Sequence, residues 1–406
     1  MGDHSILISG ASIAGPVLAS WLGAAGWDVT VVERFDHLRA EGQNVDIRGV
    51  GRQVLRRMGL EDVAMAAHTG ETGMKLVDEH GRAIAAFPAG TDESRGATAE
   101  LEILRGQLGG LVYRQSADKA SYRFGDQIAA LHDDGAGVDV RFRSGDRRRF
   151  DIVVLAEGLR SHTRAQLMPE ATVHELGVYT AHLAIPRAET DDSWWAMHLC
   201  GRGRQVYLRP DNVGGTRAAL QFLSDVRGLE RLDREDQIAL LRKTFADVGW
   251  AGPRVLDALD NGSMYFEGIG QMRLDTWSRG RIALVGDAAY CASPYSGMGS
   301  TLALTGAYIL AGELIGQDDP RLAFARYEQR LRPLVEQAQR LPIGTPRSTA
   351  PRGRLENKAF HAVMRAGATP LYRGISGFLG KFRKPSQEAI TLPDYRMPGL
   401  GAVPVS

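Results

Sequence analysis

The amino-terminal segment has the pattern of a single βαβ unit, and this pattern constrains the fold more than any other feature. Residues 5–9 are a short apolar run, a glycine-rich turn follows, and apolar residues then recur at helical spacing over residues 13–25. Residues 29–32 are a second, β-branched run. Strands joined through a helix pair in parallel, so the segment predicts the start of a doubly wound α/β sheet.

The rest of the chain alternates between this sheet and a second one. Between about residues 177 and 270, strand-like segments predict a separate, mostly antiparallel sheet with one inserted helix over 230–246. The expected elements of the first part are helices over 50–58, 101–113, 301–315 and 321–340 and strands over 151–155 and 281–285. The expected strands of the second sheet are 179–185, 194–199, 205–209, 216–223 and 264–267, with a hairpin over 74–87.

Composition argues against several classes of function. The chain has 406 residues and a formal net charge of +1, so no broad basic field would attract nucleic acid or an anionic membrane. Cys200 and Cys291 lie far apart and form no CxxC pair, so we expect neither a disulfide framework nor a metal site. The apolar run 6–22 is interrupted by glycines and Pro16 and has no basic segment before it. We therefore expect a cytoplasmic monomer or homodimer without stable membrane association.

The turn of the βαβ unit is a nearly complete dinucleotide-binding loop. Residues 10–15 keep the first and last glycines of the GxGxxG pattern and have Ser12 at the middle one. Gly10 permits the tight turn, Gly15 lets helix and strand pack closely, and the helix N-terminus offers N–H groups to a pyrophosphate. The loop alone could be an ordinary glycine-rich turn. Glu33 at the tip of the second strand can accept both ribose hydroxyls of an adenosine, which favours a dinucleotide.

A second signal follows the strand expected over 281–285. Gly286 and Asp287 end that strand, and a segment with Pro294 and two glycines precedes an uninterrupted helix. A carboxylate at this position can hold a ribityl hydroxyl, and a helix opened by glycines can direct its N–H groups and positive dipole at a group that becomes anionic on reduction. A flavin has both parts. The alternative makes Asp287 a helix N-cap and the glycines turn formers.

Together with a third motif between them, these segments resemble the single-component FAD-dependent aromatic hydroxylases, whose founder is p-hydroxybenzoate hydroxylase. Residues 10–15 with Glu33 and Arg34, residues 156–164 and residues 286–299 match the three motifs of that family in order and spacing, over residues 1 to about 340. Residues 42–49 and Pro16 look most like the branch that contains tetracycline-inactivating monooxygenases and hydroxylases of polycyclic natural products.

The resemblance implies a fold of the α/β class with two interleaved domains. One is a Rossmann-like FAD-binding domain, the other is a substrate domain built on a mostly antiparallel β-sheet, and C-terminal helices complete the chain. The expected boundaries are 1–73, 101–176 and 272–340 for the FAD-binding domain, 74–100 for a substrate-domain hairpin, 177–271 for the substrate domain, and 341–406 for a C-terminal helical segment, with a helix around 355–383, and a tail.

The resemblance also assigns residues to non-covalently bound FAD. Glu33 would bind the adenosine ribose, Arg34 and Arg105 would lie near the pyrophosphate or ribityl chain, and Asp287 would bind the ribityl hydroxyls. Arg48 would lie at the isoalloxazine edge and position flavin or substrate, although it could instead form a structural ion pair. The expected cofactor-binding residues are Gly10, Ser12, Ile13, Ala14, Gly15, Glu33, Arg34, Arg48, Arg105, Leu131, Glu157, Gly286, Asp287, Pro294, Gly297, Met298 and Gly299.

Two positions depart from the family motifs. Ser12 replaces the middle glycine, and its Cβ needs more room beside the phosphates. Glu157 stands where the middle motif generally has aspartate, and its extra methylene lengthens the reach of the carboxylate. Whether Glu157 keeps a role in organising the flavin and nicotinamide contacts therefore depends on the geometry around it.

The implied reaction uses NADPH or NADH and molecular oxygen. The chain has a single dinucleotide loop, so NAD(P)H would bind transiently. The resemblance implies reduction of FAD, formation of a C4a-hydroperoxyflavin and transfer of its distal oxygen to an electron-rich carbon of an aromatic or polycyclic substrate. The protein would supply positioning, a dry pocket and electrostatics. Two alternatives stay open: a reductase or dehydrogenase of the same fold, and a flavoprotein that sequesters a drug or metabolite without turnover.

The substrate should lie between the flavin and the second sheet. Aromatic and methionine side chains suit a flat apolar ligand, but the same residue types are common in sheet cores, so both interpretations stay open. His182 and His198 are expected to be ordinary strand residues, because the sequence pairs neither with a carboxylate. The candidate substrate residues are Trp194, Trp195, Met197, Tyr207, Gln221, Phe222 and Pro294.

Overall fold

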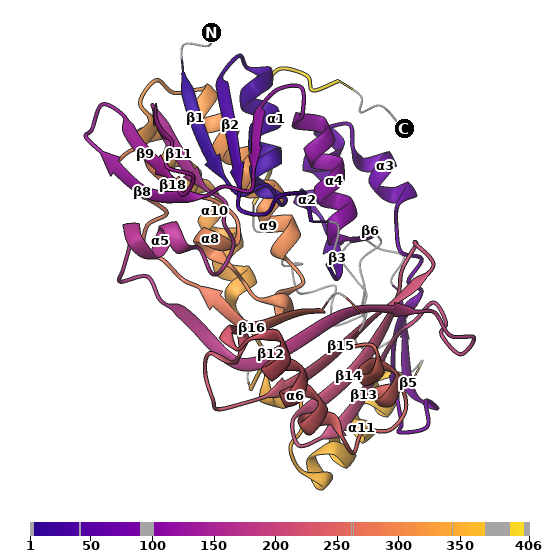
Figure 1. The fold of residues 1–406 in the computed structure, drawn as a ribbon. Helices are drawn as coiled ribbons and strands as arrows, with labels where there is room; N and C mark the ends of the chain where they lie inside the picture. The colour runs from indigo at the N-terminus through magenta and orange to yellow at the C-terminus, as the bar shows by residue number, and fades with distance from the viewer. Residues whose placement is uncertain are drawn as a thin grey trace.

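Two large sheets dominate the fold, a mainly parallel one in the upper part of Figure 1 and a mainly antiparallel one in the lower part. The computed structural model describes residues 4–39, 42–89, 101–260, 262, 264–342, 344–369 and 390–401. Within these ranges no helix combines the length and the apolar character needed to cross a membrane. The predicted α/β class, with a Rossmann-like part, a second antiparallel sheet and C-terminal helices, is confirmed.

The first sheet has the strand order β17-β18-β11-β1-β2-β7, and all its strand pairs are parallel except β17 with β18. The apolar residues Ile6, Leu7 and Ile8 of the central strand β1 are all fully buried. Successive side chains point to opposite faces, so both faces of the sheet are covered. The strands are β1 (Ser5–Ser9), β2 (Asp28–Glu33), β7 (Ser121–Phe124), β11 (Ile152–Leu155), β17 (Ser278–Arg279) and β18 (Ile282–Leu284).

Helices and a small three-stranded sheet surround the first sheet and share its core. The expected helices at 13–25, 50–58, 301–315 and 321–340 are present within two residues at each end. The helices are α1 (Ala14–Ala24), α2 (Val50–Arg57), α3 (Glu61–Ala66), α4 (Arg105–Ser116), α5 (His162–Leu167), α8 (Asp287–Tyr290), α9 (Gly299–Ile315) and α10 (Pro320–Gln339). The small sheet contains β8 (Ile128–Asp133), β9 (Val138–Phe142) and β10 (Arg147–Phe150).

The helix expected over 101–113 is wrong in its first turn. Leu101–Leu104 forms strand β6, and α4 begins at Arg105. β6 pairs antiparallel with β3 (Asn44–Ile47), with Ile47 opposite Leu101. All residues of β6 are buried, and a short, fully buried run gives no periodicity that separates a strand from a helix. This β3–β6 pair lies between the two large sheets (Figure 1).

The second sheet has the order β16-β12-β15-β14-β13-β4-β5 and is antiparallel except where β13 lies beside β4. One face packs on α6 (Arg234–Phe245) and α7 (Gly252–Asp257), and the opposite face turns toward the first part of the molecule. The strands are β4 (Gly73–Val77), β5 (Ala83–Pro88), β12 (Val173–Pro186), β13 (Trp195–Gly201), β14 (Arg204–Pro210), β15 (Gly215–Leu223) and β16 (Met264–Met272).

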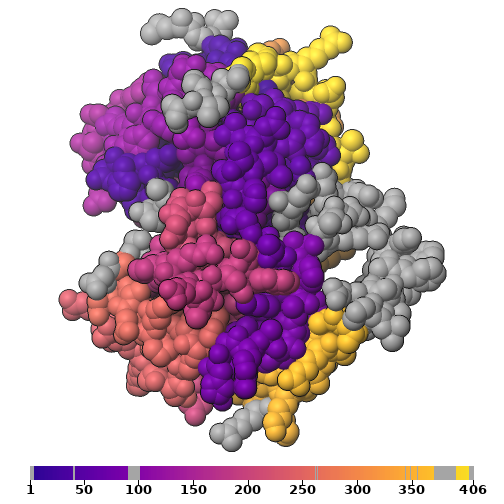
Figure 2. Space-filling view, turned by 90° about the vertical axis from the view of Figure 1, so that its right-hand side faces the viewer, coloured from indigo at the N-terminus to yellow at the C-terminus, as the bar shows by residue number. Residues whose placement is uncertain are grey.

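The chain passes between the two parts several times. In Figure 2 the parts lie one above the other, and the β4–β5 hairpin lies in the lower part beside strands from much later in the sequence. α11 (Arg354–Gly367) packs against β5 and β13, and residues 390–401 return to the first part, where Arg57 donates to the Pro393 carbonyl at 2.6 Å. Positions 370–383 of the expected C-terminal helix and 90–100 of the hairpin segment lie outside the described residues.

Candidate functional site

The three glycine-containing motifs meet at the carboxyl ends of β1, β11 and β18. Gly10 follows β1, and a Cβ added there would lie 2.4 Å from the carbonyl oxygen of Ala156, which follows β11. Gly286 follows β18, and an added Cβ would lie 3.4 Å from the Cβ of Ala14 in α1. Ligands of open α/β sheets bind at this edge, so the shared position of the motifs marks the candidate nucleotide site.

Glycine is required at positions 10 and 15, for the tight turn and the close packing that the sequence predicts. Gly10 has a φ of +112°, which side chains with a Cβ rarely adopt, and a Cβ on Gly15 would lie 2.0 Å from the Gly10 carbonyl oxygen. α1 therefore begins directly against the turn. Ile13 occupies its N-cap and has no polar side chain to cap the first N–H groups, so these donors are available to an anion.

A groove opens beside this turn, and Ser12 and Arg105 meet in it. Arg105 Nη2 donates to Ser12 Oγ at 3.0 Å, so the departure from glycine gives Arg105 a fixed partner in the turn after β1. Glu33 accepts the Ala11 N–H at 2.8 Å. The groove has about 370 Å³ of free space, part of it open to solvent, and is lined by Ala11, Ser12, Glu33, Leu38, Arg39, Arg105, Gly106 and Gly109.

Arg39 lines this groove, and the sequence analysis did not single it out. Arg34, which the resemblance places near the pyrophosphate or ribityl chain, is exposed, and its guanidinium lies 4.8 Å from the centroid of the Phe35 ring. Arg39 lies 4.5 Å from the same ring and is a wall of the groove. The signal that could have found Arg39 is its place in the loop that follows β2 at the ligand-binding edge of the sheet.

Asp287 begins α8, shortly after the carboxyl end of β18. Its side chain is exposed there, but dense protein around it limits hydration and raises the pKa of the carboxyl above its usual value. Arg105 opposes this rise and Glu267 adds to it, which places both groups within electrostatic reach of Asp287. The expected cofactor residues Arg105 and Asp287 therefore interact electrostatically.

Glu157 is saturated by hydrogen bonds from its own surroundings. Its Oε1 accepts from Ser9 Oγ at 2.6 Å and Thr163 Oγ1 at 2.7 Å, and its Oε2 accepts from Ser161 Oγ at 2.6 Å and Thr163 N at 3.2 Å. These donors belong to the end of β1 and the start of α5. The longer side chain therefore ties two motifs together, which supports an organising role rather than direct contact with a ligand.

Arg48 lies opposite the loop 294–299, which precedes α9. Arg48 Nη2 donates to Asp46 Oδ2 at 2.7 Å, so the ion pair considered from the sequence is present. A Cβ on Gly297 would lie 3.8 Å from Asp46 Oδ2, and a Cβ on Gly299 would meet no described atom within 4 Å. The N-terminus of α9 thus opens onto free space beside this ion pair, as a flavin ring would require.

The remaining expected cofactor residues are placed as follows. Pro294 opens a short 3₁₀ turn, Pro294–Ser296, and Met298 is buried next to it. Leu131 lies on β8 and packs against the core of the first part. Contact of these residues with the cofactor stays a prediction.

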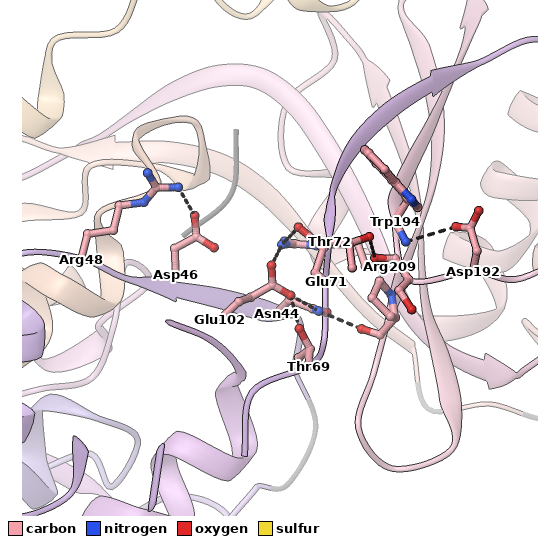
Figure 3. A network of polar contacts seen from close by, with 12 residues as sticks. Asn44, Asp46, Arg48, Thr69, Glu71, Thr72, Glu102, Asp192, Trp194 and Arg209 are labelled. Carbon is pink, nitrogen blue, oxygen red and sulfur yellow. Dashed lines mark hydrogen bonds and ion pairs between the residues drawn. The ribbon is translucent and has the colours of Figure 1, made fainter. Parts of the chain in front are cut away.

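The face of the second sheet that turns toward loop 294–299 carries several candidate substrate residues. Trp195 and Tyr207 pack edge to face with ring centroids 6.1 Å apart. Gln221 Nε2 donates to the hydroxyl of Tyr295 at 3.2 Å, which connects the sheet to the loop. Met197 packs toward α11, in a cluster with Leu199. Trp194 precedes β13, and its backbone N–H donates to Asp192 at 3.1 Å (Figure 3).

The prediction that Phe222 contacts substrate is wrong. Phe222 follows Gln221 on β15 and therefore points to the other face of the sheet. There it stacks on Tyr179 and Phe266 with centroid distances of 5.7 and 6.3 Å, and α6 covers it through Phe245. Phe222 is a core residue.

His182 has a carboxylate partner that the sequence analysis missed. His182 Nε2 lies 3.3 Å from Glu267 Oε1, on neighbouring strands β12 and β16. Burial alone would raise the pKa of Glu267, but the hydrogen bond and charge of His182 lower it overall. His198, in contrast, has its Nδ1 3.1 Å from the Val77 carbonyl oxygen and is a strand residue, as expected. Only the strand register brings His182 and Glu267 together.

A buried polar network joins the second sheet to the β3–β6 pair (Figure 3). Arg209 Nε and Nη2 donate to Glu71 at 2.8 and 3.1 Å, and Nη2 also donates to Glu102. Glu102 accepts in addition from Asn44 and Thr69, both at 2.6 Å. Burial, opposed by Arg209 and reinforced by Glu102, raises the pKa of Glu71 to about 9. Glu71 therefore keeps its proton at neutral pH, and the Arg209–Glu71–Glu102 group has no net charge.

Glu71→Gln is expected to flatten the loss of stability as pH rises from about 4.5 to about 9. The folded-state pKa of Glu71 lies above its ordinary value of 4.5, so its contribution is complete below that value and is lost as pH rises toward 9. In the wild type, Glu71 changes the free energy of unfolding by at most about 1.4 kcal/mol per pH unit. Thermal unfolding across this range measures it, with Glu79→Gln on an exposed turn as the control. Equal slopes for Glu71→Gln and wild type would show that Glu71 is ionised in the folded protein.

Known proteins identify the family to which this site belongs. Residues 3–341 match the family described as FAD binding domain. The FAD-dependent monooxygenase asL4 of Sarocladium schorii is 33% identical over 374 residues, which cover 84% of this chain and 86% of that relative. The chain belongs to the FAD-dependent monooxygenases. The flavin-dependent monooxygenase eupH of a Phoma species is 34% identical, with 100% of both chains covered.

A solved structure supports the same assignment for the whole fold. The crystal structure of tetracycline destructase Tet(51) matches with a TM-score of 0.79 and 29% identity, covering 97% of this chain and 99% of the destructase. The resemblance to FAD-dependent hydroxylases and FAD as the cofactor of this monooxygenase are confirmed, with NAD(P)H as the reductant usual in the family. Of the functions left open by the sequence, oxygenation is the one that the named relatives share.

Proposed function

We propose that this monooxygenase hydroxylates a planar aromatic or polycyclic small molecule held between loop 294–299 and the facing side of the second sheet. The observation that carries the proposal is the wall formed by Trp195, Tyr207 and Gln221, which Gln221 joins to the loop through Tyr295. Flat aromatic side chains with a few polar groups suit a flat ligand. The name of tetracycline destructase Tet(51) indicates a polycyclic substrate for that relative, which favours the polycyclic class here.

The chain's own residues fit FAD along the whole cleft. The uncapped start of α1 would receive the pyrophosphate, Glu33 the adenosine ribose, Arg105 the phosphates or ribityl chain, and Asp287 the ribityl hydroxyls. Bound FAD supplies the redox chemistry: it takes electrons from NAD(P)H and activates O₂. The residues around loop 294–299 would hold the substrate against the flavin and exclude water.

The proposal is tested with labelled oxygen. The holoenzyme is incubated with NADPH or NADH, ¹⁸O₂ and a panel that includes tetracycline, a dihydroxyanthraquinone and a naphthol. We expect at least one planar member to accelerate NAD(P)H oxidation and to gain one labelled oxygen atom. Reduction of the compound without the label would support the reductase, and tight binding without turnover would support sequestration; either result contradicts the proposal.

Glu33→Ala is expected to raise the dissociation constant of FAD about tenfold, because a hydrogen bond to a charged group contributes about 1.5 to 3 kcal/mol. Titration of apoprotein with FAD measures it. Asp28→Ala, at the exposed beginning of the same strand, is the matched control. If Glu33→Ala binds FAD as tightly as the wild type, Glu33 does not contact the cofactor. Its role is then limited to its hydrogen bonds with the Ala11 and Phe35 N–H groups.

A further inference from the structure

The basic side chains that face the proposed substrate space are each paired with a carboxyl group. On the β3–β6 side, Arg48 is paired with Asp46 at 2.7 Å. On the sheet, Arg217 lies 3.1 Å from Asp211, and His182 lies 3.3 Å from Glu267. Arg105 and Arg39 lie in the nucleotide groove, where the phosphates of FAD would engage them. Among the described residues of these facing surfaces, a ligand therefore meets groups of side chains whose net charge is zero or negative.

Arg209 lies against the aromatic wall and has carboxyl and aromatic partners. Its Nε and Nη2 donate to Glu71 and Glu102, whose side chains are 1% and 4% exposed. The flat face of its guanidinium lies 4.6 Å from the centroid of the Trp195 ring. A carboxylate on a ligand would therefore meet a group that Glu102 already neutralises, and a buried charge without a partner of opposite charge is strongly unfavourable.

The same wall offers an uncharged donor. The indole Nε1 of Trp195 is buried, and it has no hydrogen-bond partner among the described residues. Buried donors are nearly always paired in native proteins, so this one fits an oxygen acceptor brought by a ligand. The ring that carries it is fixed between Arg209 and Tyr207.

We propose that the substrate is a planar aromatic compound without net negative charge, bound through carbonyl or hydroxyl oxygens, and that ion pairing of Arg48 and Arg209 excludes aromatic carboxylates. This inference rests on the proposed position of the substrate between the loop and the sheet. It assigns a specificity role to Asp46 and Glu102, which neutralise the charge of the two arginines.

The test compares a carboxylate with its methyl ester, which has nearly the same shape and no charge. The probes are hydroxynaphthoate and its methyl ester, and a dihydroxyanthraquinone carboxylate and its methyl ester. Binding to the holoenzyme is followed through the absorbance spectrum of FAD, and turnover through NAD(P)H oxidation and product mass. We expect each ester to bind at least about tenfold more tightly than its carboxylate, the ratio that about 1.4 kcal/mol produces.

Variants show whether the ion pairs cause this preference. Asp46→Asn frees Arg48 with almost no change of shape, and we expect the preference for the ester to shrink about tenfold. Glu102→Gln alone leaves Arg209 bonded to Glu71, so the double variant Glu71→Gln/Glu102→Gln is used to free Arg209, and it should act in the same direction. Glu71→Gln is the matched control, because Glu71 keeps its proton at neutral pH and its replacement by Gln removes no charge. An unchanged preference in both Asp46→Asn and the double variant Glu71→Gln/Glu102→Gln would contradict the role given to the ion pairs.

The outcomes separate this inference from the proposed function. A carboxylate that binds as well as its ester and is hydroxylated would overturn the inference and leave the function standing. Esters that bind preferentially but gain no oxygen would support the inference and contradict the function. If no probe perturbs the flavin spectrum, both are contradicted, because a planar aromatic site between loop and sheet should accept the neutral probes.

Discussion

Asp287→Ala is expected to purify almost without FAD. The carboxylate stands at the carboxyl end of β18 and the start of α8, and reduced hydration already raises its pKa, so its ionised form depends on partners in the cleft. We propose that two ribityl hydroxyls are such partners. A hydrogen bond to a charged group contributes about 1.5 to 3 kcal/mol, so losing two should weaken FAD binding by about a hundredfold or more.

The ratio of flavin to protein absorbance after purification, followed by FAD titration of the apoprotein, measures this effect. Asp287→Asn keeps the shape and should fall between wild type and the alanine variant. Asp318→Ala, which changes an exposed aspartate after α9, is the control for nonspecific effects. A fully yellow Asp287→Ala protein would remove Asp287 from the proposed FAD site.

Most residues of the candidate nucleotide site can be predicted from the sequence, because the backbone conformation and close packing that they provide depend on local sequence. Gly10 needs its backbone conformation and Gly15 its close approach whatever lies elsewhere in the chain, so the spacing of a few residues predicts the turn. Gly286 and Asp287 follow a short buried strand in the same way. The convergence of these motifs at one edge then follows from the parallel order of β1, β11 and β18.

The residues on the substrate side of the cleft are harder to predict, because they depend on strand register and on contacts between distant parts of the chain. Gln221 and Phe222 are adjacent, and which of them faces loop 294–299 is fixed by the pairing of β15 with β12 and β14. His182 meets Glu267 only through the register of β12 with β16. The sequence of β6 does not distinguish a strand from a helical turn, because all its residues are buried.

The Arg209 network could not be predicted from the sequence for the same reason. Glu71, Glu102 and Arg209 come from a loop, from β6 and from β14, and no sequence spacing relates them. A charged residue on a strand is usually solvated, so the sequence alone gives no reason to expect this group to be buried. Only the packing of the two sheets creates the buried site and with it the raised pKa of Glu71.

Glu157→Ala is expected to produce the largest loss of stability at the site. Ser9, Ser161 and Thr163 are buried, and together they direct four hydrogen bonds at the Glu157 carboxylate. Removing the acceptor leaves buried hydroxyls without their partner, at about 1 to 3 kcal/mol for each group that stays unpaired. A destabilisation of at least about 3 kcal/mol should follow, together with weaker FAD retention, because the same bonds join the end of β1 to α5.

Two substitutions of Glu157 separate the effect of side-chain length from the effect of charge. Glu157→Gln keeps the length, and the hydroxyl groups of Ser9 and Thr163 can rotate to accept from the amide, so it should retain most of the stability. Glu157→Asp keeps the charge but is one methylene too short to reach both ends of the network, so it should be the less stable of the two. Thermal unfolding of FAD-saturated protein ranks the variants, and stopped-flow reduction by NAD(P)H at saturating ligand measures flavin function. If Glu157→Gln is as stable as wild type yet is reduced much more slowly, the carboxylate acts directly on the flavin or nicotinamide, and its saturation by Ser9, Ser161 and Thr163 does not describe its role.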